Sequence, residues 1–579
     1  MASLKETINQ RKRIWLTVIN GLLALLISWV LVPESWLQGI IKFATLPVLA
    51  VALIGFLFVL VNQIRRLPKP ALKKRFSKGI IIFLVAAAGF QFVHEEFGYK
   101  ILMDEYNLTA TSFNMHVNKT AFTPTRGLET RGDFEFVDGY IDKRPYLFPF
   151  LVSIVHDLTG YRVSNPFILN ALLTCGLFLV VYLTGFHLGN KRGGILAVLI
   201  LAGLPLIAQN ATGAGFELLN FLLIALSLYL SLSLAARPGL DKESLLVLSV
   251  ILLAHVRYES ILFLFPVALL LACRWKSNQR IGPGWITTFS PWLLIPLVLQ
   301  NRWFNSREDL WELPGDVTVP FSLDYVPENI GHAMVYFFNW SPEYPNSMLV
   351  TVLGGLSLFF LLVVSLKRYK NWMRFKPRDF DVLGLWGVAL LGHMFVVLAY
   401  HVGKLDSHFA TRLGLPVHLI LVLAPVWVLV KEKLGTRIWN TLIVGSALYL
   451  VTISAPHSSQ GIYTKKNFTE REFRWVKGIL DEDVDEQYLV LDSYMSYWVS
   501  YKKQAMHIRQ AIASREQLLQ DFSSGRFPEV FVVQRIVVDP VNERSTVRPG
   551  NEMPGFELET IDEYVSKPFQ GVRLSRLTR

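Results

Sequence analysis

The sequence is poor in cysteine and in charged residues. Only two of its 579 residues are cysteines, Cys175 and Cys273, and both lie in apolar runs. Two isolated cysteines of this kind are typical of small buried hydrophobic residues, and they exclude a disulfide framework or a cysteine-ligated metal site. Charged residues make up 18% of the chain and hydrophobic residues 52%. Because this balance is too apolar for an ordinary soluble multidomain protein, it predicts an integral membrane protein.

The apolar residues are gathered in stretches of membrane-crossing length. A transmembrane helix needs about 20 mostly apolar residues. Thirteen stretches approach this length: residues 14–32, 41–61, 79–93, 165–186, 193–208, 216–235, 244–256, 259–273, 285–300, 347–366, 382–400, 412–430 and 437–454. The first has no small-residue cleavage site, so we expect a retained helix and not a signal peptide. The sequence therefore predicts an α-helical polytopic membrane protein with about 13 transmembrane helices.

The basic residues are unevenly distributed among the loops. The chain has a net charge of +12, and Lys and Arg are concentrated in every second loop, at 11–13, 65–78, 191–192, 274–280, 367–378 and 431–437. Intervening loops such as 33–39 and 209–215 contain neither residue. Because cytoplasmic loops carry an excess of Lys and Arg, this pattern predicts a cytoplasmic N-terminus and an extracytoplasmic C-terminus. It also favours a membrane protein over a nucleic-acid-binding protein.

Three predicted outer segments are long: 94–164, 301–346 and 455–579. The first two exceed the length of ordinary connectors, which usually indicates function. The third turns polar, with helical patterns at 468–480 and 515–522 and buried-strand patterns at 488–491 and 530–533. We therefore predict a transmembrane hairpin with a basic cytoplasmic loop at 1–78, a main transmembrane module at 79–454, and a small α/β extracytoplasmic domain at 455–579.

Several ionisable residues lie near the outer ends of the predicted spans. Asp104 and Glu105 form an adjacent acidic pair in the first outer loop, a pattern that solvated loops also show. Glu217 lies at the outer mouth of an apolar helix, where a charge is costly unless it is paired or faces a cavity. Two further clusters lie at outer boundaries: His255, Arg257 and Glu259, and Lys404, His408 and Arg412. Both clusters suit an interfacial position, but carboxylates beside cations also suit a reaction that releases an anionic phosphate at the lipid headgroup level.

This arrangement resembles the GT-C glycosyltransferases, particularly the branch of protein O-mannosyltransferases and lipid A aminoarabinose transferases (glycosyltransferase family 39-like). Four features carry the resemblance: the Asp104–Glu105 pair in an outer loop, Lys143-Arg144-Pro145 before an apolar stretch, Glu217 at the mouth of a mid-chain span, and Arg412 opening a late span. The resemblance covers roughly residues 79–430. Three predicted spans precede the loop where the family usually has one, because residues 14–61 form an added hairpin, and Arg144 replaces the first proline of the family's Lys-Pro-Pro core.

The resemblance implies a chemistry for these residues. Asp104 would be the catalytic base and Glu217 its supporting acid, while Glu105 would orient the acceptor or be solvated. The donor-phosphate contacts would be Lys143, Arg144, Arg257, Lys404 and Arg412, and the sugar or acceptor contacts Tyr106, Tyr140, His255, Glu259 and His408. The implied reaction is an inverting sugar transfer from a polyprenyl-phosphate donor to an extracytoplasmic protein, glycolipid or cell-envelope polysaccharide, in a bacterial inner membrane. A divalent metal could assist phosphate departure, but the scattered histidines do not indicate a ligand set.

Two other classes of protein fit the topology. A transporter or flippase of a lipid-linked or anionic substrate would place ionisable residues near mid-membrane at broken helices, and its two halves would resemble each other. The polar residues here lie at the outer ends of spans, and duplicated halves are not evident. A non-catalytic envelope assembly protein would have the same fold without the chemistry, and the acidic residue at Asp104 argues against it.

Overall fold

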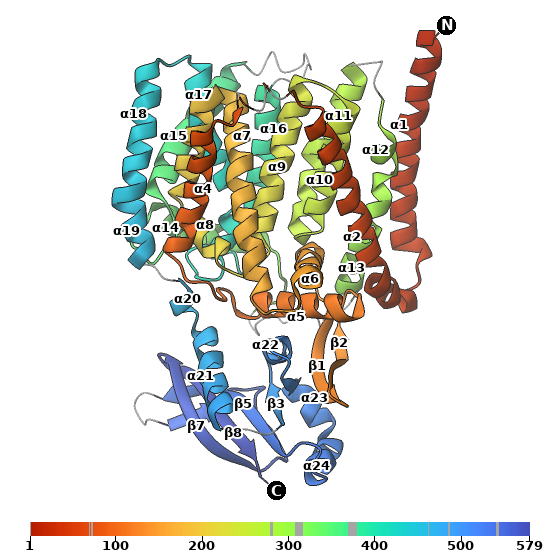
Figure 1. The fold of residues 1–579 in the computed structure, drawn as a ribbon, viewed down its shortest axis with the longest axis vertical. Helices are drawn as coiled ribbons and strands as arrows, with labels where there is room; N and C mark the ends of the chain where they lie inside the picture. The colour runs from red at the N-terminus through yellow and green to blue at the C-terminus, as the bar shows by residue number, and fades with distance from the viewer. Residues whose placement is uncertain are drawn as a thin grey trace.

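The computed structural model describes residues 2–68, 70, 73, 75–277, 282–306, 317–368, 379–460, 463–483, 487–539 and 544–578. Parts of the predicted loops 65–78, 274–280, 301–346 and 367–378 therefore lie outside the described residues. The molecule has a bundle of long helices at one end and a β-sheet domain at the other (Figure 1).

The helix bundle contains most of the apolar sequence. It is formed by α1 (Ala2–Leu26), α2 (Glu34–Arg65), α4 (Lys78–Val93), α7 (Asn165–Ala202), α8 (Pro205–Ala211), α9 (Glu217–Ala236), α10 (Leu240–Ala254), η2 (Tyr258–Phe263), α11 (Leu264–Ser277), α12 (Trp285–Phe289), η3 (Ser290–Leu294), α13 (Ile295–Asn305), α14 (Val326–Phe338), α15 (Met348–Arg368), α16 (Asp379–Leu398), η7 (Thr411–Gly414), α17 (His418–Lys431), α18 (Thr436–Tyr449), η8 (Leu450–Ser454) and α19 (Ala455–Gln460). Two short helical segments, η1 (Ile27–Leu31) and η5 (Leu323–Tyr325), complete it.

The predicted spans fall on these helices. All thirteen coincide largely with helical residues, and two of them, 165–186 and 193–208, lie mostly in α7 on either side of a kink at Gly189 and Asn190. Eight helical segments of the described chain are long and apolar enough to cross a membrane, and three apolar helices are shorter. The predicted class, an α-helical polytopic membrane protein, is confirmed.

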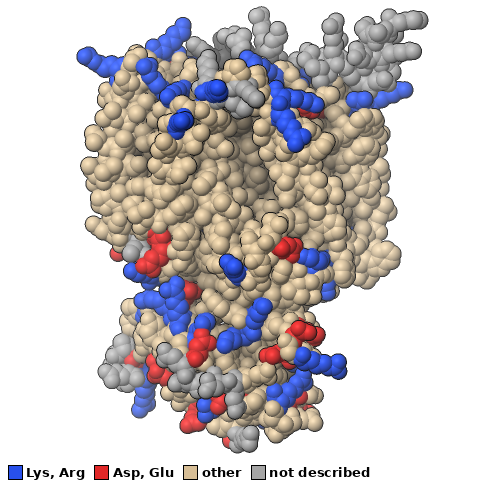
Figure 2. All heavy atoms as spheres, viewed as in Figure 1, with Lys and Arg blue, Asp and Glu red and all other residues tan. Residues whose placement is uncertain are grey.

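The charges divide the surface into zones. On the face drawn in Figure 2, Lys and Arg gather at the end of the bundle far from the sheet, and a broad belt without charged side chains crosses the middle of the bundle. Asp and Glu, mixed with further Lys and Arg, appear on the other side of this belt and on the sheet domain. Such a belt is the surface that lipid tails would cover.

The sheet domain combines two distant parts of the chain. Its strand order is β2-β1-β4-β3-β5-β8-β7, and β6 pairs with β5. The C-terminal elements are α20 (Tyr463–Lys466), α21 (Phe468–Asp483), β3 (Tyr488–Asp492), α22 (Met495–Ser500), β4 (Gln504–Met506), α23 (Ile508–Ala513), α24 (Arg515–Ser523), β5 (Glu529–Asp539), β6 (Arg544–Val547), β7 (Leu558–Lys567) and β8 (Gln570–Leu577). The helices and buried strands predicted in this region, and hence its α/β character, are confirmed by α21, α24, β3 and β5.

The first outer loop supplies the other two strands. It contains α5 (Leu102–Asn118), β1 (Thr123–Thr130), β2 (Asp133–Tyr140) and α6 (Leu147–Thr159). β1 pairs with β4 in antiparallel register, with Arg126 opposite Met506 and Gly127 opposite Ala505. The hairpin β1–β2 thus extends from the bundle into the sheet of the C-terminal domain (Figure 1), a connection that the sequence patterns did not predict.

Aromatic side chains join α5 to the C-terminal domain on a second side. The ring of Tyr106 contacts those of Phe473 and Tyr497 edge-on, with centroids 5.2 and 5.4 Å apart. Tyr106 and Tyr497 are both 1% exposed. Because edge-to-face aromatic packing is directional as well as apolar, α5 is held firmly between the bundle and the sheet domain.

Candidate active site

The helix α5 lies across the end of the bundle, and its start is fixed by Glu105. The Oε2 atom of Glu105 accepts hydrogen bonds from the backbone N–H groups of Lys100 (2.5 Å) and Ile101 (2.9 Å), and Oε1 accepts one from Ala214 (2.7 Å). N–H groups at a helix start have no partner within the helix, so a side chain that satisfies them fixes where it begins. Burial raises the pKa of Glu105 to about 7, although the three backbone N–H groups lower it.

Two glycines let the chain before α9 approach α5 closely. A Cβ atom on Gly213 would lie 2.8 Å from Oε1 of Glu105, and one on Gly215 would lie 2.3 Å from Oε2 of Glu217. The carbonyl oxygens of both glycines accept hydrogen bonds from the amide of Asn170, at 2.8 and 2.9 Å. This loop therefore places Glu217, the first residue of α9, beside α5.

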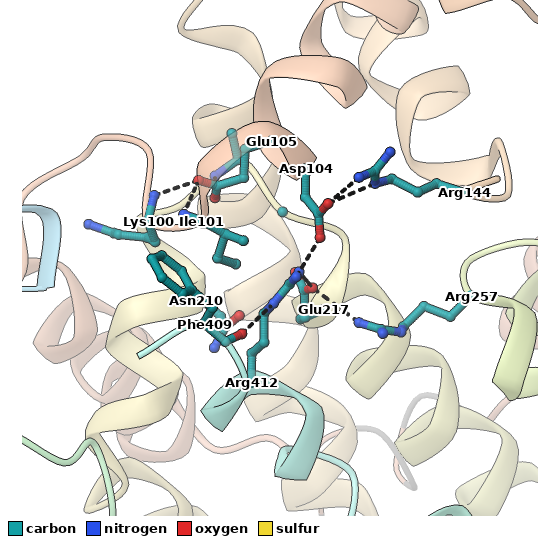
Figure 3. Close-up of polar contacts among 12 residues, drawn as sticks. Lys100, Ile101, Asp104, Glu105, Arg144, Asn210, Glu217, Arg257, Phe409 and Arg412 are labelled. Carbon is teal, nitrogen blue, oxygen red and sulfur yellow. Dashed lines mark hydrogen bonds and ion pairs between the residues drawn. The ribbon is translucent and has the colours of Figure 1, made fainter. Parts of the chain in front are cut away.

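Asp104 lies one residue before Glu105 and is held by two arginines (Figure 3). Its Oδ1 atom accepts hydrogen bonds from Nε of Arg144, at 3.0 Å, and from Nη2 of the same side chain, while Oδ2 accepts one from Nη2 of Arg412. Nη1 of Arg144 also donates to both carboxylate oxygens of Asp142, at 2.7 and 2.9 Å. Burial opposes ionisation of Asp104, but the two guanidinium groups outweigh it and lower the pKa of Asp104. Asp104 is therefore ionised at neutral pH.

Arg412 joins this pair to Glu217. Its Nη1 atom donates to Oε1 of Glu217, which also accepts from Nη1 of Arg257 at 3.1 Å. Nε of Arg257 in turn donates to Glu259, and Nε of Arg412 donates to the carbonyl oxygen of Phe409 at 3.0 Å. Figure 3 shows these side chains converging from separate elements on one point. We name Asp104, Arg144, Glu217, Arg257 and Arg412 the acid–arginine cluster.

The exposure of the cluster is graded. The side chain of Glu217 is 2% exposed and that of Arg412 is 11% exposed, whereas that of Asp104 is 22% exposed. Among the described residues, Oε2 of Glu217 has no hydrogen-bond partner. Asp104 is thus the more accessible of the two carboxylates, and Glu217 is the more deeply buried.

Two cavities flank the residues next to the cluster. The larger, of about 540 Å³, lies between α5 and the C-terminal domain, and its lining includes Asn107, Tyr140 and Arg144. The smaller, of about 130 Å³, is lined by residues of the bundle that include Tyr258 and Gln300. Lys143 and Phe304 line both cavities. The segment that carries Lys143 and Arg144 therefore lies between the smaller cavity in the bundle and the larger cavity beside the C-terminal domain.

The other residues predicted for the site divide into two groups. Tyr106, Tyr140 and Lys143 line the larger cavity, and Glu259 reaches the cluster through Arg257. Lys404, His255 and His408 make their contacts elsewhere. Lys404 donates to the exposed Glu328 at 2.5 Å, His255 is hydrogen-bonded to the carbonyl oxygen of Leu293 at 2.8 Å, and the ring of His408 stacks on that of Tyr463 with centroids 6.0 Å apart.

The structure adds residues that the sequence analysis did not select. Asp142 holds Arg144, and its position one residue before Lys143 was the only signal for it. Lys100 forms a buried salt bridge with Glu95 at 2.9 Å, and the carboxylate of Glu95 accepts the backbone N–H groups of Tyr463 and Thr464 at 2.8 and 2.7 Å. This contact ties the residues before α5 to α20. Within the described residues, no group of three or more His, Cys, Asp or Glu is placed to hold a metal ion.

Comparisons with known proteins find similarity only at the level of structure. No protein-family profile and no curated sequence matches the chain. ArnT from Cupriavidus metallidurans is similar in its apo state, with 12% identity, coverage of 86% of this chain and 98% of ArnT, and a TM-score of 0.49. ArnT bound to undecaprenyl phosphate has 12% identity, the same coverage and a TM-score of 0.46.

A second similar structure is the oligosaccharyltransferase AglB from Archaeoglobus fulgidus, in complex with an inhibitory peptide and a dolichol-phosphate. It has 10% identity, coverage of 82% of this chain and 74% of AglB, and a TM-score of 0.44. ArnT and AglB have the GT-C fold. Because the TM-scores lie below 0.5, the function proposed below depends on the geometry of the acid–arginine cluster.

Proposed function

We propose that the chain is an integral-membrane glycosyltransferase that transfers a sugar from a polyprenyl-phosphate donor to an extracytoplasmic acceptor, with inversion at the anomeric carbon. The observation that carries the proposal is the acid–arginine cluster, in which the accessible, ionised carboxylate of Asp104 is held by the buried guanidinium groups of Arg144 and Arg412 beside a cavity. We likewise propose residues 79–454 as the catalytic module.

Asp104 is the base of the proposed reaction. An acceptor hydroxyl is a poor nucleophile until its proton is removed, and a carboxylate within hydrogen-bond reach can remove it in the transition state. In the unliganded protein, Arg144 and Arg412 make Asp104 a weak base because they lower its pKa. A donor phosphate that accepts hydrogen bonds from the same guanidinium groups weakens their interaction with Asp104. Its pKa then rises, and donor binding and base activation occur together.

The arginines stabilise the leaving group. When the bond between the anomeric carbon and the phosphate oxygen breaks, the lipid phosphate leaves as an anion and needs no proton. Guanidinium groups bind phosphate through two parallel N–H donors, and fixed donors in a site that excludes water are worth more than donors in solution. Glu217 keeps Arg257 and Arg412 in place for this role.

The donor must reach the cluster from the outer leaflet. The cluster includes Asp104 of α5, which lies at the end of the bundle next to the sheet domain (Figure 1), and the Lys and Arg of the bundle gather mainly at its opposite end (Figure 2). Basic residues mark the cytoplasmic side, so this arrangement supports an extracytoplasmic site. Nucleotide sugars cannot cross the bilayer, and a flipped lipid-linked sugar is therefore the donor that fits.

The test is sugar transfer from a labelled polyprenyl-phosphate sugar by protein reconstituted in liposomes with crude envelope acceptors. Asp104→Asn should lower the rate by about 10²–10⁴-fold, the usual worth of a general base. Asp157→Asn is the matched control, since Asp157 lies on α6 and its partners are His116 and Lys119. Undiminished transfer by Asp104→Asn would show that the assigned base is wrong. Movement of the lipid-linked sugar across the bilayer without transfer would indicate a flippase.

A further inference from the structure

The larger cavity has a strongly basic lining. Five of its lining residues are basic and one is acidic: Lys143, Arg144, Arg509, Arg535, Arg548 and Asp142. Three of the basic residues, Arg509, Arg535 and Arg548, belong to the C-terminal domain and not to the bundle. The domain therefore contributes most of the positive charge of a space that reaches the acid–arginine cluster through Arg144.

These arginines differ in their partners. Arg535 is neutralised by Asp492 at 3.4 Å and Glu472 at 3.6 Å, and its guanidinium group lies 4.8 Å from the centre of the Tyr494 ring. In contrast, no side-chain ion pair of Arg509 or Arg548 is present within the described part of the chain, and both residues are exposed. Unpaired cations in a concave site bordered by protein concentrate the field and attract anions.

The remaining lining suits a carbohydrate. The rings of Tyr140 and Tyr494 lie with the amides of Asn107 and Asn551 in the same lining, and Asn107 donates to the hydroxyl of Tyr140 at 3.2 Å. Aromatic rings pack on the apolar faces of sugars, and a few placed amides fix the orientation of a ligand. A peptide that bound by adding a strand would instead need a strand edge along the cavity, whereas the sheet strands contribute only single positions such as Thr125 and Tyr140.

We propose that this cavity binds the acceptor, that the acceptor is an anionic carbohydrate, and that Arg509 and Arg548 of the C-terminal domain bind its phosphate or carboxylate group. This inference rests on the proposed function and names the substrate class for the same site. The acceptor lies between the two arginines and Arg144, which also contacts the base Asp104. The C-terminal domain is therefore part of the acceptor site.

Binding to protein in nanodiscs tests the proposal with defined probes. The probes are a phosphorylated glucosamine disaccharide, a digalacturonate, neutral N,N′-diacetylchitobiose and an acidic serine peptide, each titrated by calorimetry at two salt concentrations. Of the two anionic disaccharides, we expect the one with the higher affinity to bind about tenfold more tightly than the neutral disaccharide, as one or two charge-assisted contacts predict. The phosphorylated and uronic probes show which anion the arginines prefer.

The variants separate this inference from the proposed function. The double variant Arg509→Glu with Arg548→Glu should lose the preference for anionic disaccharides, while Arg131→Glu, at an exposed position in the turn between β1 and β2, should retain it. Equal binding of neutral and anionic disaccharides, tighter binding of the acidic peptide, or an unchanged double variant would overturn the inference. Intact binding without any sugar transfer by the unaltered protein would refute the proposed function while supporting the anion site.

Discussion

The substitution Arg412→Met tests the acid–arginine cluster most directly, because Arg412 is the side chain that joins its two halves. Its guanidinium group bonds Asp104 through one terminal nitrogen and Glu217 through the other. Methionine has a similar length and no charge. The variant leaves Asp104 with Arg144 and Glu217 with Arg257, so each carboxylate retains one partner.

The expected loss follows from burial. Removing one partner of a buried ion pair usually costs about 3–5 kcal/mol, because the remaining charge is left without compensation. Since both carboxylates here have a second arginine, we expect a loss near the lower end, about 3 kcal/mol. Arg412→Lys preserves the charge but not the planar fork, so it should lose about half as much. Adding Glu217→Gln to Arg412→Met removes one of the two carboxylates that lost a partner, and the two effects should be less than additive by about 1–3 kcal/mol.

The assay is the free energy of unfolding, measured by detergent titration in mixed micelles with tryptophan fluorescence. The control is Arg66→Met, which breaks an ion pair with Asp241 whose side chains are 72% and 44% exposed. Exposed pairs contribute about 0–1 kcal/mol, so this variant should be close to the unaltered protein. The reasoning is refuted if Arg412→Met and Arg66→Met lose similar stability, or if the losses of Arg412→Met and Glu217→Gln simply add.

Two further predictions concern Glu105. The pKa of Glu105 in the folded protein is about 7, above its ordinary value of 4.5. The contribution of Glu105 to the free energy of unfolding is therefore complete below about pH 4.5 and is lost as the pH rises through about 7. The loss is on the order of 3 kcal/mol. Thermal unfolding between pH 5 and 8 should show this decline, and Glu105→Gln should flatten it; a profile that the substitution leaves unchanged would contradict the assignment. Gly213→Ala should destabilise by about 1–3 kcal/mol, because its Cβ would overlap the Glu105 carboxylate. Gly445→Ala is the control and should not destabilise the protein, because its Cβ would meet no atom within 4 Å. Equal stabilities of the two variants would contradict the close approach of Gly213 to Glu105.

The helix bundle could be predicted from the sequence because hydropathy and length are local properties of each segment. The same holds for α21, α24, β3 and β5, whose patterns lie within single stretches. The pairing of β1 with β4 could not be predicted. It joins Gly127 to Ala505 across most of the chain, and β4 has only three residues, too few to show an alternating pattern. Register between such short strands is decided by the packing around them and not by their own sequence.

The sequence predicted how far along each span the site residues lie, but not which way their side chains point around the bundle. Charged residues at the ends of apolar spans were expected at one membrane surface, and Asp104, Glu217, Arg257 and Arg412 do meet there. A position at the end of a span does not say which way around the bundle a side chain points. For that reason Lys404 was equivalent to Arg412 in the sequence, although its ammonium group pairs with Glu328 at an exposed position.

The charges of the cluster also bear on how a phosphate binds. Three arginines face four carboxylates, since Asp142 and Glu259 hold Arg144 and Arg257 in addition to Asp104 and Glu217. A phosphate would add to this negative excess, so a further cation is required, and Lys143 lies next to Arg144 on the lining of both cavities. The arginines can still donate to the phosphate, because each guanidinium group has five N–H donors. Arg412 uses three of them for Asp104, Glu217 and Phe409. The carboxylates thus fix the arginines in position without exhausting their donors, which is what a site that stabilises a leaving phosphate requires.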